Sequence, residues 1–122
     1  SILLKNSNQQ NTHPVVSTFL KEFNKKENFN LSIADICKNK NYSQEYINRL
    51  FKNANLDSPN HIFLKNKLTY ASHLLISSDI KIIDITETCG IFTVSYFNKA
   101  FKKLFGIPPS AYRKKYTLLN TH

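Results

Sequence analysis

Several residue types are scarce in this chain of 122 residues, and each scarcity excludes a class of protein. The two glycines, Gly90 and Gly106, are too few for Gly-rich phosphate loops or for a series of β-hairpins. The two cysteines, Cys37 and Cys89, have no CxxC partner and no histidine at metal-ligand spacing, which predicts two small core residues in a reducing compartment. No run approaches the roughly 20 apolar residues of a membrane span, and no signal peptide is visible.

Methionine is absent altogether, and the sequence begins at Ser1. From this we expect a piece of a longer protein, in which a further domain precedes this one. Residues 1–13 are polar and rich in Asn and Gln, which is typical of a linker from that domain.

Acidic residues are also scarce, with 8 Asp and Glu against 17 Lys and Arg, so the net charge is +9. A basic chain of this size indicates a polyanionic partner, which is DNA, RNA or an anionic membrane. The 41% of hydrophobic residues are enough for a core, and the length suits one compact domain or two very small ones sharing a core.

Apolar residues recur at helical spacing along the first half of the chain. A helix is predicted after Pro14, and a short helix is predicted to be capped by Ser32 with Asp35 as its capping-box partner. A longer helix follows with Ser43 as its cap. In the turn between them we expect Asn41 to take the left-handed conformation in place of glycine.

The second half opens with a long helix, predicted from Pro59 to about Ser77. Its apolar arc is wider than one packed face requires, as in a helix that contacts units on both sides. The remaining predicted elements are a short helix from Ile82, a longer one capped by Thr93 and ended by Gly106, and a last short helix from Pro108.

The chain repeats itself. Residues 33–36 match residues 82–85, and residues 46–52 match residues 96–102. The offset rises from 49 (33 to 82) to 50 (46 to 96), so the second turn carries one inserted residue. A short helix, a tight turn and a longer helix, twice, predict an all-α seven-helix bundle of two helix-turn-helix subdomains, 14–57 and 79–122, joined by a linker helix, 58–78.

The two longer helices are predicted to share an outward pattern of a polar start, an Asn followed by a long cation, and then a Lys. Between Thr93 and Phe105 there is no acid, whereas an ordinary solvated helix mixes Glu and Lys. This pattern favours base reading, and the alternative is a pair of helical hairpins that only pack together. A linker helix ~28 Å long would hold the two helices at about the ~34 Å spacing of successive major grooves. The inward faces are predicted to contain Tyr46, Leu50, Tyr96 and Leu104.

The run from Gly90 to Lys103, followed by Gly106-Ile107-Pro108-Pro109 and Tyr112-Arg113, resembles the C-terminal signature of AraC-family regulators. The first unit is similar more loosely, and the likeness covers roughly residues 15–116. It implies two helix-turn-helix units that bind adjacent major grooves, a separate sensing domain that is often N-terminal, and in most members activation by contact with RNA polymerase. The matching residues outside the signature are Leu31, Asp35, Ser43, Tyr46, Arg49, Leu50, Phe51, Lys52, Ala71, Leu74 and Leu75. The departures are Asn41 and a position near Leu56 where glycine is usual, Lys99 where Arg is common, and Ile91 where Phe is common.

Residues on the outward faces are predicted to read bases. Arg49 favours guanine and Asn48 adenine, while Val94 suits a thymine methyl group. Glu45 accepts from cytosine, or repels phosphate and so rejects wrong registers, or is only a favourable first-turn charge. The full predicted set is Glu45, Asn48, Arg49, Val94, Ser95, Asn98 and Lys99.

A second set of polar and basic residues is predicted to contact phosphates, which sets affinity and register. The alternative for any single lysine is ordinary solubility. The set is Ser43, Lys52, Lys65, Thr93, Lys102, Lys103, Arg113, Lys114 and Lys115.

The residues disfavour two other classes of function. An enzyme is disfavoured, because the histidines have no metal spacing and no nucleophile–base set is visible, so no catalytic residue, metal or cofactor is expected. An RNA-binding or protein-interaction module would expose aromatic rings, whereas here Phe and Tyr are predicted on buried arcs. We therefore expect double-stranded DNA and RNA polymerase as partners, a preceding sensor or dimerisation domain, no membrane, a monomeric isolated domain and a cytoplasmic, nucleoid-associated location. The histidines concerned are His13, His61, His73 and His122.

Overall fold

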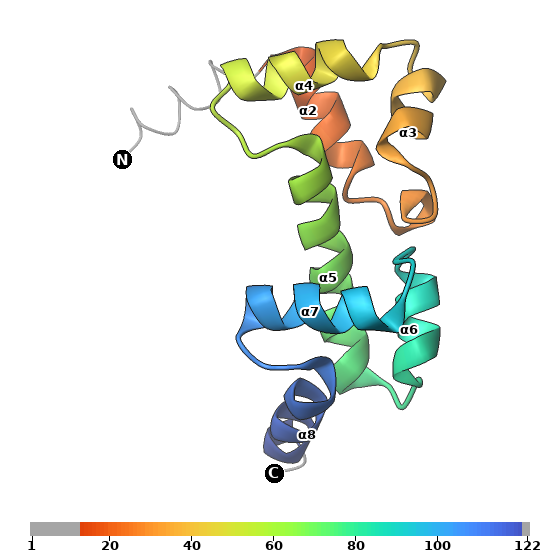
Figure 1. Ribbon diagram of the computed structural model, residues 1–122, viewed down its shortest axis with the longest axis vertical. Coiled ribbons are helices and arrows are strands. Elements are labelled where there is room, and N and C mark those ends of the chain that lie inside the picture. The colour runs from red at the N-terminus through yellow and green to blue at the C-terminus, as the bar shows by residue number, and fades with distance from the viewer. Residues whose placement is uncertain (1–12, 121–122) are drawn as a thin grey trace. The chain divides into compact units, whose positions relative to one another are not determined.

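The computed structural model describes residues 13–120 and the side chains of residues 13–117. Within that range it contains seven α-helices and one 3-10 turn and no strand, so the all-α prediction is confirmed (Figure 1). The predicted linker over 1–13 lies, except for His13, outside the described residues. The elements are α2 (Pro14–Glu22), η1 (Lys26–Asn28), α3 (Ile33–Asn39), α4 (Gln44–Asn53), α5 (Pro59–Ser77), α6 (Ile82–Thr88), α7 (Val94–Phe105) and α8 (Pro109–Asn120).

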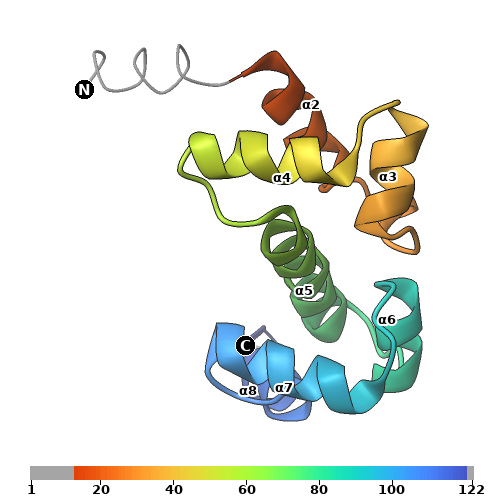
Figure 2. The ribbon, with the colours of Figure 1, turned by 45° about the horizontal axis from the view of Figure 1, so that its top comes forward.

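The described part of the chain forms two compact units, one up to Phe63 (unit 1) and one from Leu64 onward (unit 2), and the division falls within α5. In each unit a short helix leads through a tight turn into a longer one, α3 into α4 and α6 into α7 (Figures 1 and 2). The two predicted helix-turn-helix hairpins are therefore present. The long helix α5 gives Phe63 to the core of unit 1 and Leu68, Ala71 and Leu75 to the core of unit 2, which explains its wide apolar arc.

Unit 1 is built around phenylalanine rings. The ring of Phe23, just after α2, lies 5.9 Å from that of Phe51 on α4 and 5.4 Å from that of Phe63 on α5. Burying such rings supplies most of the stability of a unit this small. The buried apolar residues of unit 1 are Val16, Phe19, Phe23, Phe29, Ile33, Ile36, Cys37, Ile47, Phe51 and Phe63.

The caps and turns of unit 1 largely follow the sequence. Ser32 and Asp35 form the predicted capping box at the start of α3, and Asn41 has a φ of 65°. The position after α4 that replaces a glycine, expected near Leu56, is Asn55, with a φ of 60°. Asparagine tolerates this left-handed conformation because its short polar side chain bonds locally.

Unit 2 packs its own aromatic cluster against α5. Phe101 on α7 lies 5.7 Å from Phe97, 4.5 Å from Phe105 and 5.2 Å from Tyr112 of α8, measured between ring centroids. Gly106, with a φ of 88°, ends α7 as predicted. The last helix was expected to be short, but α8 has 12 residues.

Two inward assignments on α7 were wrong. Tyr96 is 51% exposed and Leu104 is 38% exposed. The buried stripe of α7 is narrower than the sequence pattern suggested, because Phe97 and Phe101 already fill the space against α5 and α6.

Candidate nucleic-acid interface

The two longer helices, α4 and α7, begin in the same way. The hydroxyl oxygen of Ser43 accepts the backbone N–H of Tyr46 at 3.1 Å, and the hydroxyl oxygen of Thr93 accepts that of Tyr96 at 3.0 Å. Such caps fix the first residue of each helix and hence the direction of every later side chain. Residues at the same distance from the two caps therefore occupy equivalent positions.

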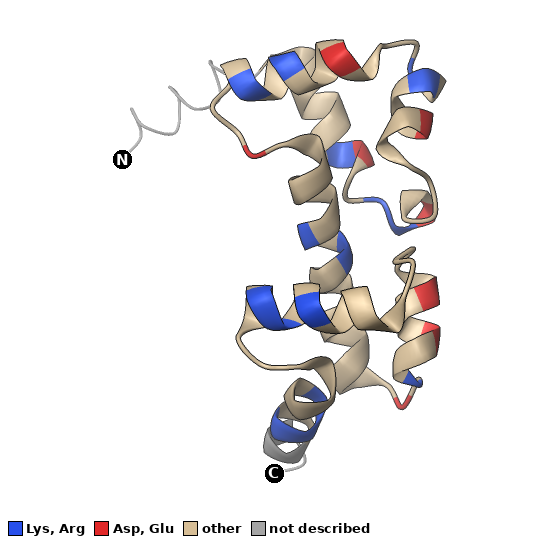
Figure 3. Cartoon of the chain, viewed as in Figure 1, with Lys and Arg blue, Asp and Glu red and all other residues tan. Residues whose placement is uncertain are grey.

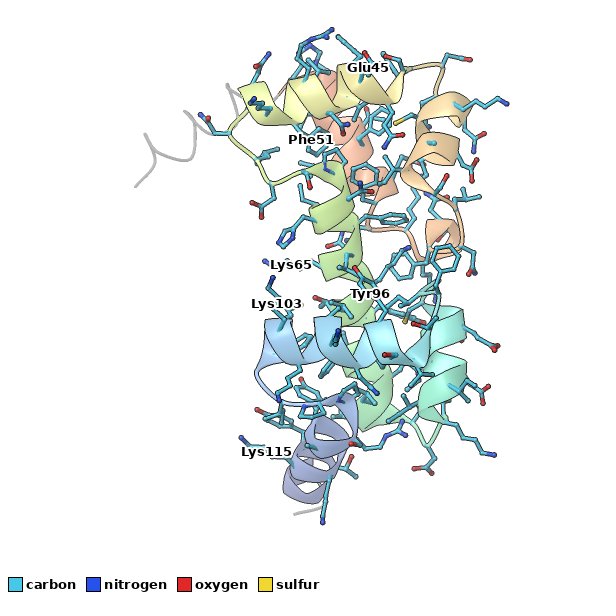
Figure 4. All side chains as sticks on the ribbon, viewed as in Figure 1. Glu45, Phe51, Lys65, Tyr96, Lys103 and Lys115 are labelled. Carbon is cyan, nitrogen blue, oxygen red and sulfur yellow. The ribbon has the colours of Figure 1, made fainter. Side chains whose placement is uncertain are left out.

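Four pairs of equivalent positions are exposed on both helices. They lie two, five, six and nine residues after the cap, which places them on one side of a helix. On α4 the large apolar residue Phe51 points into unit 1 and Glu45 points outward (Figure 4). The pairs are Glu45 and Ser95, Asn48 and Asn98, Arg49 and Lys99, and Lys52 and Lys102.

Val94 is the exception among the predicted base-reading residues. It directly follows the cap and is only partly exposed, as is Gln44 at the equivalent position of α4. Its methyl groups lie at the border between the outward face and the core, so it has less surface to offer a ligand than Ser95 or Lys99.

The side chain of Arg49 is held against an aromatic stack. Its guanidinium carbon lies 5.5 Å from the ring centroid of Tyr46, which stacks on Tyr42 at 5.7 Å and 16°. The ring of Tyr42 in turn meets Phe19 of the core edge-on. A cation over an aromatic face is attracted to it, so Arg49 is oriented before any ligand arrives. Sequence periodicity did not identify this role of Tyr46, since it assigned the residue to the core.

A hollow of about 500 Å³ lies beside the C-terminal half of α4. Polar side chains of the outward face line it together with the turn that precedes α5. Its lining residues are Asn48, Lys52, Asn55, Leu56, Ser58 and Pro59.

The charges of α7 all have one sign. It carries Lys99, Lys102 and Lys103 and no Asp or Glu, whereas the acids of α6 are Asp84 and Glu87 (Figure 3). Within the described residues none of the three lysines forms a salt bridge. Unneutralised lysines on a helix with free polar side chains suit a polyanion.

The remaining candidates for phosphate contacts mostly lie on the surface, and the Nζ of Lys115 lies 5.4 Å from the ring centroid of Tyr116. Lys65 on α5 and Lys114 and Lys115 on α8 are exposed, and Figure 4 shows Lys65 and Lys115 projecting from their helices. The oxygens of Ser43 and Thr93 accept cap hydrogen bonds, but each hydroxyl keeps a hydrogen to donate.

Arg113 is engaged inside the protein, in contrast to the expectation that it contacts phosphate. Its Nε donates to the carbonyl of Leu75 at 2.8 Å and its Nη2 to the carbonyl of Ser78 at 3.1 Å. The last carbonyls of a helix lack partners within that helix, and a cation there also suits the helix dipole. The guanidinium of Arg113, on α8, thus caps the C-terminal end of α5.

Replacing Arg113 by Ala is therefore expected to lower the free energy of unfolding by about 1.5 kcal/mol, because two carbonyls lose a charged donor. Urea denaturation of the chain measures this. The neighbouring exposed Lys114→Ala is the matched control, which should leave stability unchanged. A stable Arg113→Ala variant whose binding to DNA depends less on salt would instead support the phosphate contact.

The turn between α6 and α7 is tied to α5 by Lys67. Its Nζ donates to the carbonyl of Gly90 at 3.2 Å, and burial lowers the pKa of Lys67. Burial also raises the pKa of the neighbouring Cys89 thiol to about 11, so the thiol stays protonated and unreactive. No sequence signal distinguished Lys67 from Lys65, because a lysine in a long helix is normally solvated.

The expectation that Phe and Tyr lie on buried arcs was wrong at both turns. Tyr42 is 37% exposed, Tyr96 is 51% exposed, and Phe92 is fully exposed at 102%. All three lie at the start of α4 or α7, beside the outward polar faces.

None of the helices in the described part of the chain is both long and apolar enough to cross a membrane. Among residues 13–120, the described side chains include no group of three His, Cys, Asp or Glu placed to hold a metal ion.

Comparison with known proteins gives consistent matches. A family model described as a helix-turn-helix domain matches residues 36–115. The HTH-type transcriptional regulator GbdR of Pseudomonas aeruginosa is 35% identical over 69 residues, which are 57% of this chain and 19% of that regulator. The chain thus spans about a fifth of the length of this curated relative.

Solved structures extend the match to the fold. The C-terminal domain of AraT, a response regulator from Geobacillus stearothermophilus, superposes with a TM-score of 0.75 at 29% identity, covering 84% of this chain and 86% of that one. A transcriptional regulator from Chromobacterium violaceum, described as an AraC-type DNA-binding domain-containing protein, gives a TM-score of 0.65 at 27% identity, covering 74% and 82%.

Proposed function

Since this chain belongs to the AraC-type family of helix-turn-helix transcription regulators, which bind DNA, we propose that α4 and α7 are its two recognition helices and enter adjacent major grooves of one duplex. The observation that carries this is the match between the two helices: each has a hydroxyl cap and exposes side chains at the same four positions after it. Two recognition helices in one chain supply what other helix-turn-helix proteins obtain by dimerising.

Base reading falls to the middle of each exposed face. Asn48 and Asn98 present amides that pair with adenine through its N6 and N7 atoms. Arg49 and Lys99 present cations that donate to guanine, and Arg49 is the more specific of the two because its planar fork donates twice. Glu45, Val94 and Ser95 contact bases near the start of each helix.

Phosphate binding falls to the rim of these faces. Lys52 lies beside the hollow next to α4, and Lys102 and Lys103 follow the base-reading residues of α7. Ser43 and Thr93 donate their remaining hydroxyl hydrogens to phosphate oxygens, and Lys65, Lys114 and Lys115 add charge further out. Arg113 is left out of this set because its guanidinium closes α5.

The test is selection of binding sites from a random duplex pool, followed by gel shifts that compare the selected duplex with RNA and with its single strands. We expect two half-sites about one helical turn apart, each with an A/G-containing element, arranged as a direct repeat. Equal binding to RNA or to single strands would contradict the proposal, and unrelated half-sites would contradict the shared element.

The family also suggests a wider role for the protein. AraC-type regulators are not an enzyme class. We propose activation by contact with RNA polymerase, a sensor or dimerisation domain on the N-terminal side, a monomeric isolated domain, and a place with the nucleoid in the cytoplasm. The much greater length of GbdR, of which the match covers 19%, supports the additional domain.

Lys102→Ala is expected to weaken binding to all duplexes alike and to reduce the salt slope by ~1, since one phosphate contact is lost. Titrations of the selected duplex and of an unrelated duplex at several salt concentrations measure both effects. A loss confined to the selected duplex would place Lys102 on a base instead.

A further inference from the structure

Phe92 is an extra residue in the second helix-turn-helix turn. In the first turn a single residue, Tyr42, separates the left-handed Asn41 from the cap Ser43. In the second turn two residues, Ile91 and Phe92, separate the left-handed glycine from its threonine cap. The insertion seen as a change of repeat offset therefore lies next to the start of α7.

Backbone hydrogen bonds identify which of the two residues is the insertion. The N–H of Tyr42 donates to the carbonyl of Cys37 at 2.9 Å, and the N–H of Ile91 donates to that of Thr86 at 3.0 Å. Ile91 is thus the equivalent of Tyr42. Phe92 has no counterpart in the first turn.

The usual structural reason for an apolar residue at this position is absent. A residue before the cap often packs on the fourth helical residue, which here is Phe97. Phe97 is fully buried, whereas Phe92 is fully exposed and has no ring contact among the described residues. The ring of Phe92 therefore contributes no packing to unit 2.

The surroundings of Phe92 favour a polyanion over an apolar protein surface. It directly precedes Thr93, the cap of a helix with three lysines and no acid, and Tyr96 in the first turn of that helix is half exposed. Figure 4 shows Tyr96 and Lys103 on the same side of α7. The N-terminal residues of a recognition helix are the ones that reach base edges in the major groove.

We propose that Phe92 contacts the C5-methyl group of a thymine in the half-site bound by α7, and so determines specificity at that base pair. This inference rests on the proposed function. Thymine carries the only methyl group in the major groove, and apolar side chains recognise it by burying it. Such a contact specifies T without using a hydrogen bond, next to the polar readers Ser95 and Lys99.

The experiment replaces each thymine of the selected duplex, one at a time, by deoxyuridine, which lacks only the methyl group. The selected half-site should contain an invariant thymine whose replacement weakens binding of the unmodified chain about four-fold, the value of one buried methyl group. Phe92→Ala should bind more weakly and be insensitive to that replacement, while Phe92→Leu should keep part of the sensitivity. Ile83→Ser, which alters another exposed apolar residue of unit 2, is the matched control and should behave as the unmodified chain does.

Four outcomes would overturn the inference. If replacing no thymine by deoxyuridine weakens binding, or if Phe92→Ala remains sensitive to that replacement, Phe92 does not read a methyl group. Selective duplex binding would still support the proposed function. If Phe92→Ala binds the duplex normally but loses activation of a reporter gene, the ring serves a protein partner. If the unmodified chain does not prefer duplex DNA, the proposed function fails and the inference fails with it.

Discussion

Phe101→Ala is expected to reduce the free energy of unfolding of unit 2 by about 3–5 kcal/mol, the usual cost of removing a buried ring. Phe101 is fully buried and its ring contacts those of Phe97, Phe105 and Tyr112. The substitution would leave a cavity between α7 and α8. Neither helix could fill that cavity without losing its own packing contacts. Thermal and urea denaturation measure the effect, and Tm should fall by more than roughly 10 °C.

Phe101→Leu is the matched control, since it keeps most of the apolar volume and should cost clearly less. Footprinting provides a second readout: Phe101→Ala should lose protection of the half-site bound by α7 first, because unit 1 has its own core around Phe23, Phe51 and Phe63. A variant as stable as the unmodified chain would show that α7 is not anchored by this cluster.

Arg49→Ala is expected to cost ~1–3 kcal/mol of binding free energy on the selected duplex and to relax specificity at one base pair. The guanidinium is exposed, carries no salt bridge within the described residues, and is pre-oriented on the ring of Tyr46. A pre-oriented cation loses little side-chain entropy on binding, so its removal is expected to lower the affinity for DNA measurably. Titrations against all single-base variants of the selected duplex measure both the loss and its position.

Lys99→Ala is the comparison on α7, at the equivalent position. We expect a smaller and less base-specific loss, since an ammonium group donates from a point and has no planar fork. Tyr46→Leu should reproduce part of the loss of Arg49→Ala if the ring orients the guanidinium. An unchanged site preference in Arg49→Ala would refute its assignment to a base.

The local features of the fold followed from sequence because their causes are local. Ser32 with Asp35, Ser43 and Thr93 cap the helices that they were predicted to cap, since a cap bonds within three residues of itself. Asn41 takes the left-handed turn conformation for a similarly local reason.

The sequence predicted the exposed faces of α4 and α7, and the structure added the contacts of individual side chains. Matching the two repeats predicted the exposed pairs that begin with Asn48 and Asn98. Helical periodicity is sufficient to place these residues on one face of each helix. The internal hydrogen bonds of Arg113 were not predicted, because its partners, the carbonyls of Leu75 and Ser78, lie more than thirty residues earlier in the chain. No local pattern shows where the end of one helix meets the side chain of another.

The sequence by itself determined that the chain is all-α, that it repeats a short helix, a turn and a longer helix, and where those helices start. These properties depend on periodicity, capping and charge, which act over a few neighbouring residues. Only the tertiary structure decided that Tyr46 supports Arg49, that Lys67 holds the second turn, and that Phe92 stands wholly exposed. Each of these three features depends on how side chains that are distant in sequence pack together, and on which side chains that packing leaves exposed.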